Sequence, residues 1–198
     1  MPTSDSAAPL ALQDRALEDL RYIRATLTSA TAFTALSGVA FIAIGSGALV
    51  TVAVTHGITD PLLKVATWVA DAGVSVGIGA VGAVWKSQRT GQSMRSGPFR
   101  RFLFGLAPAV FSGAVLTYLA VISGQYTLLP CLWLLLYGTG LLAAGTFSIR
   151  VVPALGASFV ALGTVAALLP SAGPVLLAVG FGGLHLAFGY LIARHHGG

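Results

Sequence analysis

The sequence has few charged residues for its length. Asp, Glu, Lys and Arg make up only 9% of its 198 residues, whereas a typical soluble domain carries about 25%. So few charges cannot cover a surface that faces water, because charged side chains normally lie on that surface. The composition therefore excludes an ordinary soluble protein and indicates that most of the surface faces an apolar environment.

Cysteines and catalytic motifs are also scarce. Cys131 is the only cysteine, which excludes an intramolecular disulfide and a cysteine-based metal site. The sequence has no P-loop, GxSxG or HExxH motif, and it has only six acidic residues. A haem held between helices normally has two axial ligands, yet only His185 lies within an apolar block. We therefore predict a protein that is not an enzyme, with no catalytic residues, cofactor or metal.

Long apolar blocks are what the sequence has in abundance. Six blocks of about 19–24 residues follow one another, and a bilayer core of about 30 Å needs roughly 20 helical residues. We predict an all-α fold, a bundle of six transmembrane helices whose short loops make consecutive spans antiparallel neighbours. The predicted spans are Ala32–Val54, Leu62–Trp85, Phe102–Ile122, Leu128–Phe147, Val151–Leu169 and Val175–Ala193.

A short amphipathic helix precedes these blocks, over Leu10–Thr28. Its apolar residues recur every three or four positions, and its opposite face carries three acidic and three basic residues. Balanced charges bind anionic lipid poorly, so we expect this helix to pack on protein, either a partner or a second copy of the chain. The expected organisation is a cytosolic segment at 1–30, a membrane domain at 31–194 and a cytosolic tail at 195–198.

Basic residues set the expected orientation. The connection between the second and third blocks contains no acid and five basic residues, Lys86, Arg89, Arg95, Arg100 and Arg101. We interpret it as a cytoplasmic basic loop, which puts both termini in the cytoplasm. In this orientation Lys64 is the only one of the 11 Lys and Arg residues that lies outside. Such a loop can also attract anionic lipid headgroups. The net charge of +5 therefore indicates topology, and we expect no nucleic acid partner.

Small residues recur four positions apart within the blocks. Gly73 and Gly77 form a GxxxG step, and Gly140 with Ala144 is a similar pair. Such pairs let helix backbones approach closely in a membrane. Because Ala and Gly are common throughout this chain, we interpret the pairs as a sign of general close packing.

Two ionisable residues lie deep within the blocks, Asp71 in the second and His185 in the sixth. Each lies about ten residues after a proline near the start of its block, Pro61 or Pro174, which places both near the middle of the membrane. We predict that they form an intramembrane polar pair, directly or through water. The alternatives are local: Asp71 bonds a nearby Ser or Thr hydroxyl, and His185 bonds a facing carbonyl.

Two stretches, Leu132–Pro153 and Gly180–Gly198, carry a resemblance to a known group of proteins. Together with LEDLRYIRATLTSATAFTALSG near the start, they resemble a family of small, uncharacterised bacterial multi-span membrane proteins with six helices. The resemblance implies a bacterial inner membrane and brings no activity or functional residue.

Two functions are compatible with this pattern. The absence of converging polar groups and the amphipathic helix favour a non-enzymatic membrane interaction or regulatory protein. The alternative is a small-solute or proton-coupled transporter that uses Asp71 and His185 at the membrane midplane. It requires a water-accessible cavity that reaches Asp71.

Overall fold

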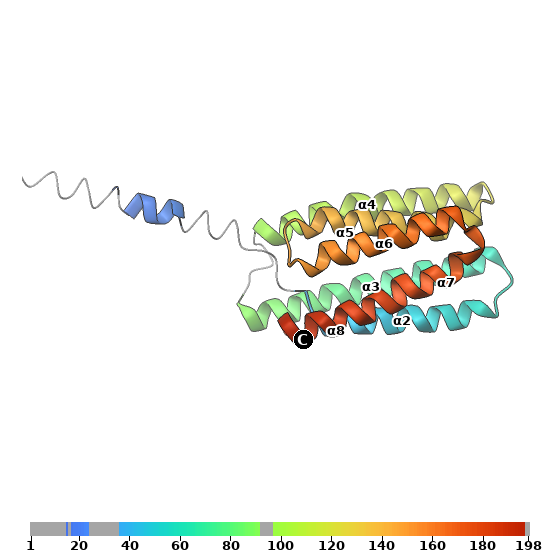
Figure 1. Ribbon diagram of the computed structural model, residues 1–198, viewed down its shortest axis with the longest axis horizontal. Coiled ribbons are helices and arrows are strands. Elements are labelled where there is room, and N and C mark those ends of the chain that lie inside the picture. The colour runs from blue at the N-terminus through green and yellow to red at the C-terminus, as the bar shows by residue number, and fades with distance from the viewer. Residues whose placement is uncertain (1–14, 16, 24–35, 92–96, 197–198) are drawn as a thin grey trace, which may run out of the picture. The chain divides into compact units, whose positions relative to one another are not determined.

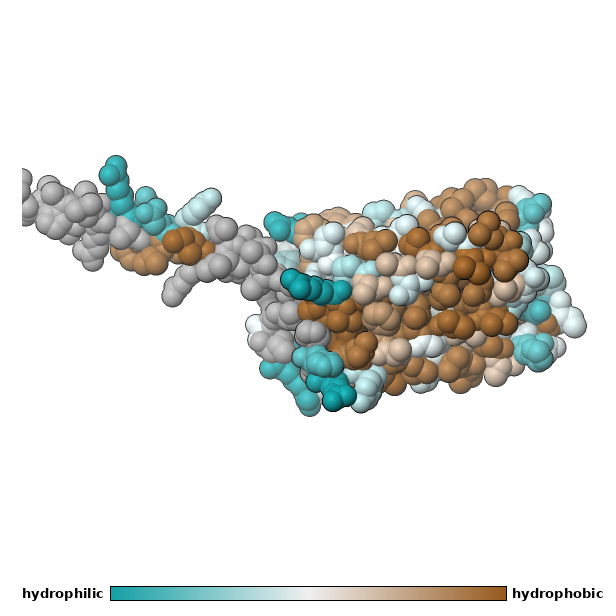
Figure 2. Space-filling view, viewed as in Figure 1, coloured by the Kyte–Doolittle hydropathy of each residue, from teal (hydrophilic) through white to brown (hydrophobic). Residues whose placement is uncertain are grey.

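The computed structural model describes residues 15, 17–23, 36–91 and 97–196, and the chain divides into two compact units, Met1–Ala32 and Phe33–Gly198. The described residues of the first unit are helical. Its apolar residues Leu17, Leu20 and Ile23 are spaced by three and exposed, and apolar and polar residues occupy opposite sides of this helix (Figure 2). The rest of the predicted helix Leu10–Thr28 lies outside the described residues.

The second unit is an all-α bundle, and the prediction of six spans is confirmed. Consecutive spans run in opposite directions (Figure 1), and an apolar belt separates two polar ends (Figure 2). The sixth span is made of three consecutive helical segments, preceded by a short 3-10 turn. The elements are α2 (Gly38–His56), α3 (Pro61–Thr90), α4 (Gly97–Ile122), η1 (Tyr126–Leu128), α5 (Leu129–Gly145), α6 (Val151–Leu168), η2 (Pro170–Ala172), α7 (Gly173–Leu177), η3 (Ala178–Leu184) and α8 (His185–His196).

Several helix ends differ from the predicted block ends. The start predicted for the first span is wrong, because Leu36 and Ser37 are not helical and the Ser37 hydroxyl caps α2 by accepting the amide of Ala40 at 3.3 Å. Helix α3 continues five residues past Trp85 and ends at Gly91, which has a φ of 68°. Apolar runs mark the part of a helix inside the hydrocarbon, and polar residues can extend that helix beyond it.

The spans bury very different shares of their residues. In the apolar 18-residue stretch of each of α3 and α4, only 6% of the residues are buried, whereas 33–39% are buried in the corresponding stretches of the other four spans. Helix α5 packs most extensively on α6, and α2 packs mainly on α8 and on one side of α3. The centre of the bundle is therefore formed by α2, α5, α6 and the sixth span, with α3 and α4 at its periphery.

Glycines allow the central helices to approach closely. A Cβ atom on Gly138 of α5 would lie 2.8 Å from the carbonyl oxygen of Gly156, and a Cβ on Gly156 of α6 would lie 2.8 Å from that of Gly138. Both distances are too short for a real side chain. Helices that meet backbone to backbone in this way gain van der Waals contact that apolar lipid cannot supply.

Candidate functional site

His185 is the most enclosed ionisable residue among those described in the bundle. It opens α8 and is 1% exposed. Its Nε2 atom lies 2.9 Å from the hydroxyl oxygen of Tyr137 on α5, and the tautomer of the ring decides which group donates. The hydrogen bond joins the sixth span to α5 across the centre of the bundle.

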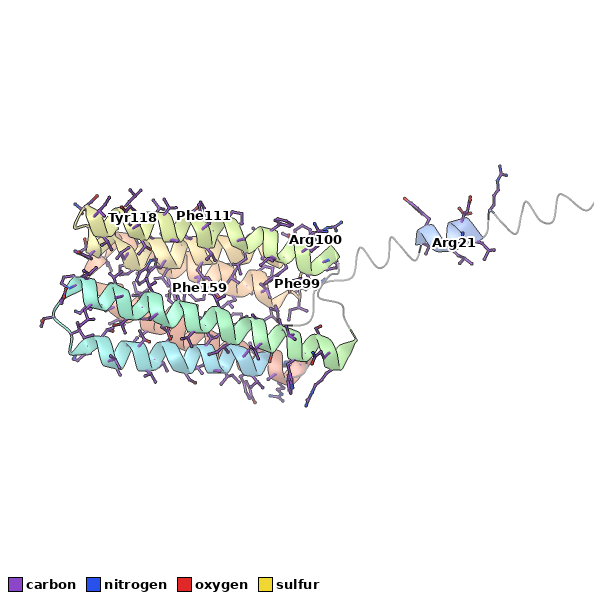
Figure 3. The ribbon with its side chains drawn as sticks, turned by 180° about the vertical axis from the view of Figure 1, so that it is seen from behind. Arg21, Phe99, Arg100, Phe111, Tyr118 and Phe159 are labelled. Atoms are coloured by element: carbon purple, nitrogen blue, oxygen red, sulfur yellow. The ribbon has the colours of Figure 1, made fainter. Side chains whose placement is uncertain are left out.

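Aromatic rings surround His185 on several sides. The rings of Phe41, Tyr137 and Phe159 have centroids 5.5 Å from the His185 ring, and the Phe181 ring is stacked on it at 6.2 Å. These rings come from α2, α5, α6 and η3. Figure 3 shows Phe159 in the interior of the bundle, whereas Phe111 and Tyr118 point away from it on α4. The imidazole therefore lies in a low-dielectric shell.

The segment that leads into His185 is a π-helix, η3, rather than an α-helix. It contains Gly180, Gly182 and Gly183, and side chains of neighbouring helices occupy the space beside two of them: Leu134 faces Gly180 and Leu49 faces Gly182. A π-helix disrupts the regular hydrogen-bond ladder, and such segments are frequent at functional sites. The sequence pattern did not predict this π-helix.

The second ring nitrogen of His185 makes no hydrogen bond. The backbone carbonyls of Gly180 and Phe181 interact with the ring, but neither makes a hydrogen bond of good geometry with Nδ1, which is buried and unsatisfied. A buried polar atom in this state is uncommon and destabilising. The site therefore combines one satisfied nitrogen with one that could accept or donate a hydrogen bond if the shell opened.

Asp71 lies in a different environment from His185. It is half-buried on α3 and faces α2, where its Oδ1 atom is 3.2 Å from the position that a Cβ on Gly47 would occupy. Its carboxylate also interacts with the Thr51 side chain. The nearby Thr67 bonds the carbonyl of Leu63 instead. Asp71 is thus bound across a helix interface and not by its own helix.

The structure does not bring Asp71 and His185 into direct contact through a hydrogen bond. Nε2 of His185 bonds Tyr137, and Nδ1 has no partner. The direct form of the predicted pair is therefore absent, and a water-bridged form stays a prediction. The partner of Nε2 is Tyr137, a hydroxyl-bearing aromatic residue in the middle of a span, where such residues are less usual than at the membrane interface, and the carbonyls of Gly180 and Phe181 also interact with the ring.

The predicted basic loop is largely helical. Lys86 and Arg89 belong to α3, Arg100 and Arg101 belong to α4, and Arg95 lies outside the described residues. Lys86 is 4% exposed, and its Nζ donates to the carbonyl of Leu36 at 2.8 Å. The description of this segment as a loop is therefore wrong for four of its five basic residues, because polar residues extend both helices beyond the apolar blocks.

The remaining basic side chains contact aromatic rings or lie at the surface. The guanidinium carbon of Arg89 is 3.8 Å from the centroid of the Trp85 ring, and that of Arg101 is 5.8 Å from the Phe147 ring. Arg100 lies at the start of α4 (Figure 3). Among the described residues, no group of three or more His, Cys, Asp or Glu side chains could hold a metal ion.

No family model, curated protein or solved structure matches the chain. The resemblance to small bacterial six-helix proteins therefore stays a prediction, and function has to be inferred from the geometry alone.

Proposed function

We propose that the protein is a non-enzymatic membrane protein that acts by binding another protein or a second copy of itself. The observation that carries this proposal is the packing around His185, which is 1% exposed and lies against four aromatic rings. A substrate path or an active site needs polar groups that water or substrate can reach. The most deeply placed polar pair, Tyr137 with His185, instead acts as a link between helices.

The N-terminal helix is the proposed docking element. Leu17, Leu20 and Ile23 present an exposed apolar side, and the charges on the other side of residues 10–28 cancel. An amphipathic helix of this kind buries its apolar side in a groove or against a similar helix. Because the helix has no net charge to draw it to anionic lipid, protein is the favoured surface, and a second copy is the first partner to test.

The experiment measures oligomeric state in native membranes. We would count subunits by stepwise photobleaching of a fluorescently tagged full chain, and compare it with the triple variant Leu17→Ser, Leu20→Ser, Ile23→Ser. The wild type is expected to be a dimer or higher oligomer and the triple variant a monomer. Glu18→Gln is the control on the polar side and should not change the count. An assembly that survives deletion of residues 10–28 would count heavily against docking by this helix.

A second candidate is a proton-coupled or small-solute transporter, favoured by the unsatisfied Nδ1 of His185 beside the π-helix η3. Buried ionisable groups within spans often mark ion or proton pathways, and π-helical segments are frequent at functional sites. In this proposal the shell opens during the cycle and connects His185 to Asp71 through water. Proton flux into proteoliposomes that falls at least tenfold in both Asp71→Asn and His185→Phe would support it; no flux in the wild type would rule it out.

We further propose a bacterial inner membrane location with both termini in the cytoplasm. In the bundle, six of the seven described basic residues lie at one end, where α3 and α8 finish and α4 and α6 begin, and Lys64 lies at the other. The six are Lys86, Arg89, Arg100, Arg101, Arg150 and Arg194. Positive-inside bias then places this basic end in the cytoplasm. A reporter enzyme active only in the periplasm should be inactive when fused after Gly198 and active when inserted after Gly57.

A further inference from the structure

A shallow apolar groove lies between α2 and α3 toward the basic end of the bundle. It is open along its length, its volume is about 490 Å³, and its lining includes Ala40, Ala43, Gly77, Val81 and Trp85. This volume falls within the range of about 300–1,000 Å³ that small-molecule sites occupy. The groove opens on the outer face of the helices, because Val81 and Trp85 are exposed there.

Small residues make this face hollow. A Cβ atom on Gly77 would meet nothing within 4 Å, so the space beside this residue is not filled by the bundle itself. Apolar lining at membrane depth matches a hydrocarbon chain, because lipid tails are as apolar as these side chains. The lining alone does not select one lipid over another.

A cation stands at one end of the groove. Trp85 belongs to the lining, and the guanidinium carbon of Arg89 lies 3.8 Å from the centroid of its ring. This contact holds an exposed arginine beside the groove. Lys86, one helical turn away, is turned inward to the carbonyl of Leu36, so at this end of α3 Arg89 is the basic side chain that faces the headgroup region.

The sequence provides few acids that could neutralise Arg89 within its own unit. The only acidic residues between Phe33 and Gly198 are Asp60 and Asp71. Asp71, the nearer in sequence, is 18 positions before Arg89 on the same helix, which is about 27 Å along its axis. An anion from outside the unit is the complement that this geometry favours, and phosphate suits the paired N–H donors of a guanidinium.

We propose that the α2–α3 groove is a binding site for an anionic phospholipid. One acyl chain lies along the groove over Gly77, and the headgroup phosphate binds Arg89 beside Trp85. The basic end would thus be held at the level of the headgroups by a bound lipid. This proposal goes beyond partner binding and does not depend on the N-terminal helix.

The test counts lipids retained by the purified full chain in native mass spectrometry. The protein is released from nanodiscs that contain equal amounts of phosphatidylglycerol and phosphatidylcholine. We expect the wild type to retain one phosphatidylglycerol in preference to phosphatidylcholine. Because one basic residue near the surface accounts for about a fivefold change in affinity, Arg89→Gln should lower retention by about fivefold. Gly77→Phe, which fills the groove, should lower it by at least as much.

Two control variants match these changes. Gly73 is also open, with nothing within 4 Å of a Cβ atom, but it does not line the groove, so Gly73→Phe should retain the lipid. Arg100 is an exposed arginine at the same end of the bundle, and Arg100→Gln should have less than a twofold effect. Equal loss in Arg100→Gln and Arg89→Gln would overturn the proposal, since binding would then be general electrostatic attraction. Equal retention of both lipids, or unchanged retention in Gly77→Phe, would overturn it as well.

Discussion

Helix α3 and the paired helices α5 and α6 are all rich in glycine, yet their glycines have different roles. Gly138 and Gly156 lie where α5 and α6 meet backbone to backbone. Gly73 and Gly77, which form the clearest GxxxG step in the sequence, face open space. A small-residue pair therefore permits close packing without specifying it, and whether it is used depends on how the whole bundle is assembled.

The centre and the periphery of the bundle also differ in how their polar side chains are held. His185, at the centre, is fully enclosed and bonded to Tyr137 on another helix. Asp71, on α3, is half-buried and bonded toward Thr51 on the neighbouring α2. The central group is fixed by its shell, whereas the peripheral group is partly free to respond to lipid, water or a partner.

The largest expected effect comes from filling the central interface. Gly156→Leu would drive a side chain into the backbone of α5, so we expect a loss of about 3 kcal/mol or more in the free energy of unfolding, above the usual range for overpacking because backbone cannot move aside easily. The measurement is unfolding in mixed detergent micelles followed by far-UV circular dichroism.

Gly73→Leu is the matched control for this change and should alter stability by less than about 0.5 kcal/mol. Gly156→Ala, a smaller intrusion, keeps the comparison measurable if the leucine variant does not fold. Equal stabilities for Gly156→Leu and Gly73→Leu would contradict the central position of the α5–α6 contact.

The number of spans could be predicted from the sequence because it depends on a local property. A run of about 20 apolar residues spans the hydrocarbon whatever its neighbours do, and prolines such as Pro61 and Pro130, near the first residues of α3 and α5, help to locate the starts. The division into central and peripheral helices could not be predicted, because lipid and protein interior are both apolar. The peripheral α4 and the central α5, for example, have nearly the same mean hydropathy.

The candidate site could be predicted only in part. His185 is recognisable as an ionisable residue deep in a span, but depth does not fix which way a side chain points around its helix. In the structure His185 bonds Tyr137 whereas Asp71 interacts with Thr51, and the π-helix η3 ends immediately before His185. Tyr137 did carry a usable signal, because its hydroxyl lies in the middle of an apolar run where it needs a partner.

An intermediate effect is expected from the bond between Tyr137 and His185. Each single variant, Tyr137→Phe or His185→Phe, leaves a buried polar atom without its partner and should lower the free energy of unfolding by about 1–3 kcal/mol. The double variant should lose less than the sum of the two, by about 1 kcal/mol, since no partner is then left unsatisfied.

The double-mutant cycle is measured by the same unfolding assay. Tyr118→Phe removes an exposed hydroxyl from α4 and serves as the control, with almost no effect expected. Strict additivity of Tyr137→Phe and His185→Phe would show that the hydrogen bond contributes nothing to stability. The distinction between a fixed His185 and a partly free Asp71 would then no longer be supported.

The smallest effect is expected at Asp71. Asp71→Asn keeps the shape and the capacity to bond Thr51, and it removes a charge that is unfavourable within a span, so stability should change by less than about 1 kcal/mol and in the direction of greater stability. The change should be the same, within about 0.5 kcal/mol, in the wild-type and His185→Phe backgrounds, because residues without shared partners act additively. Coupling above about 1 kcal/mol between the two sites would instead mean that a water bridge joins them, and the central and peripheral polar groups would have to be regarded as one unit.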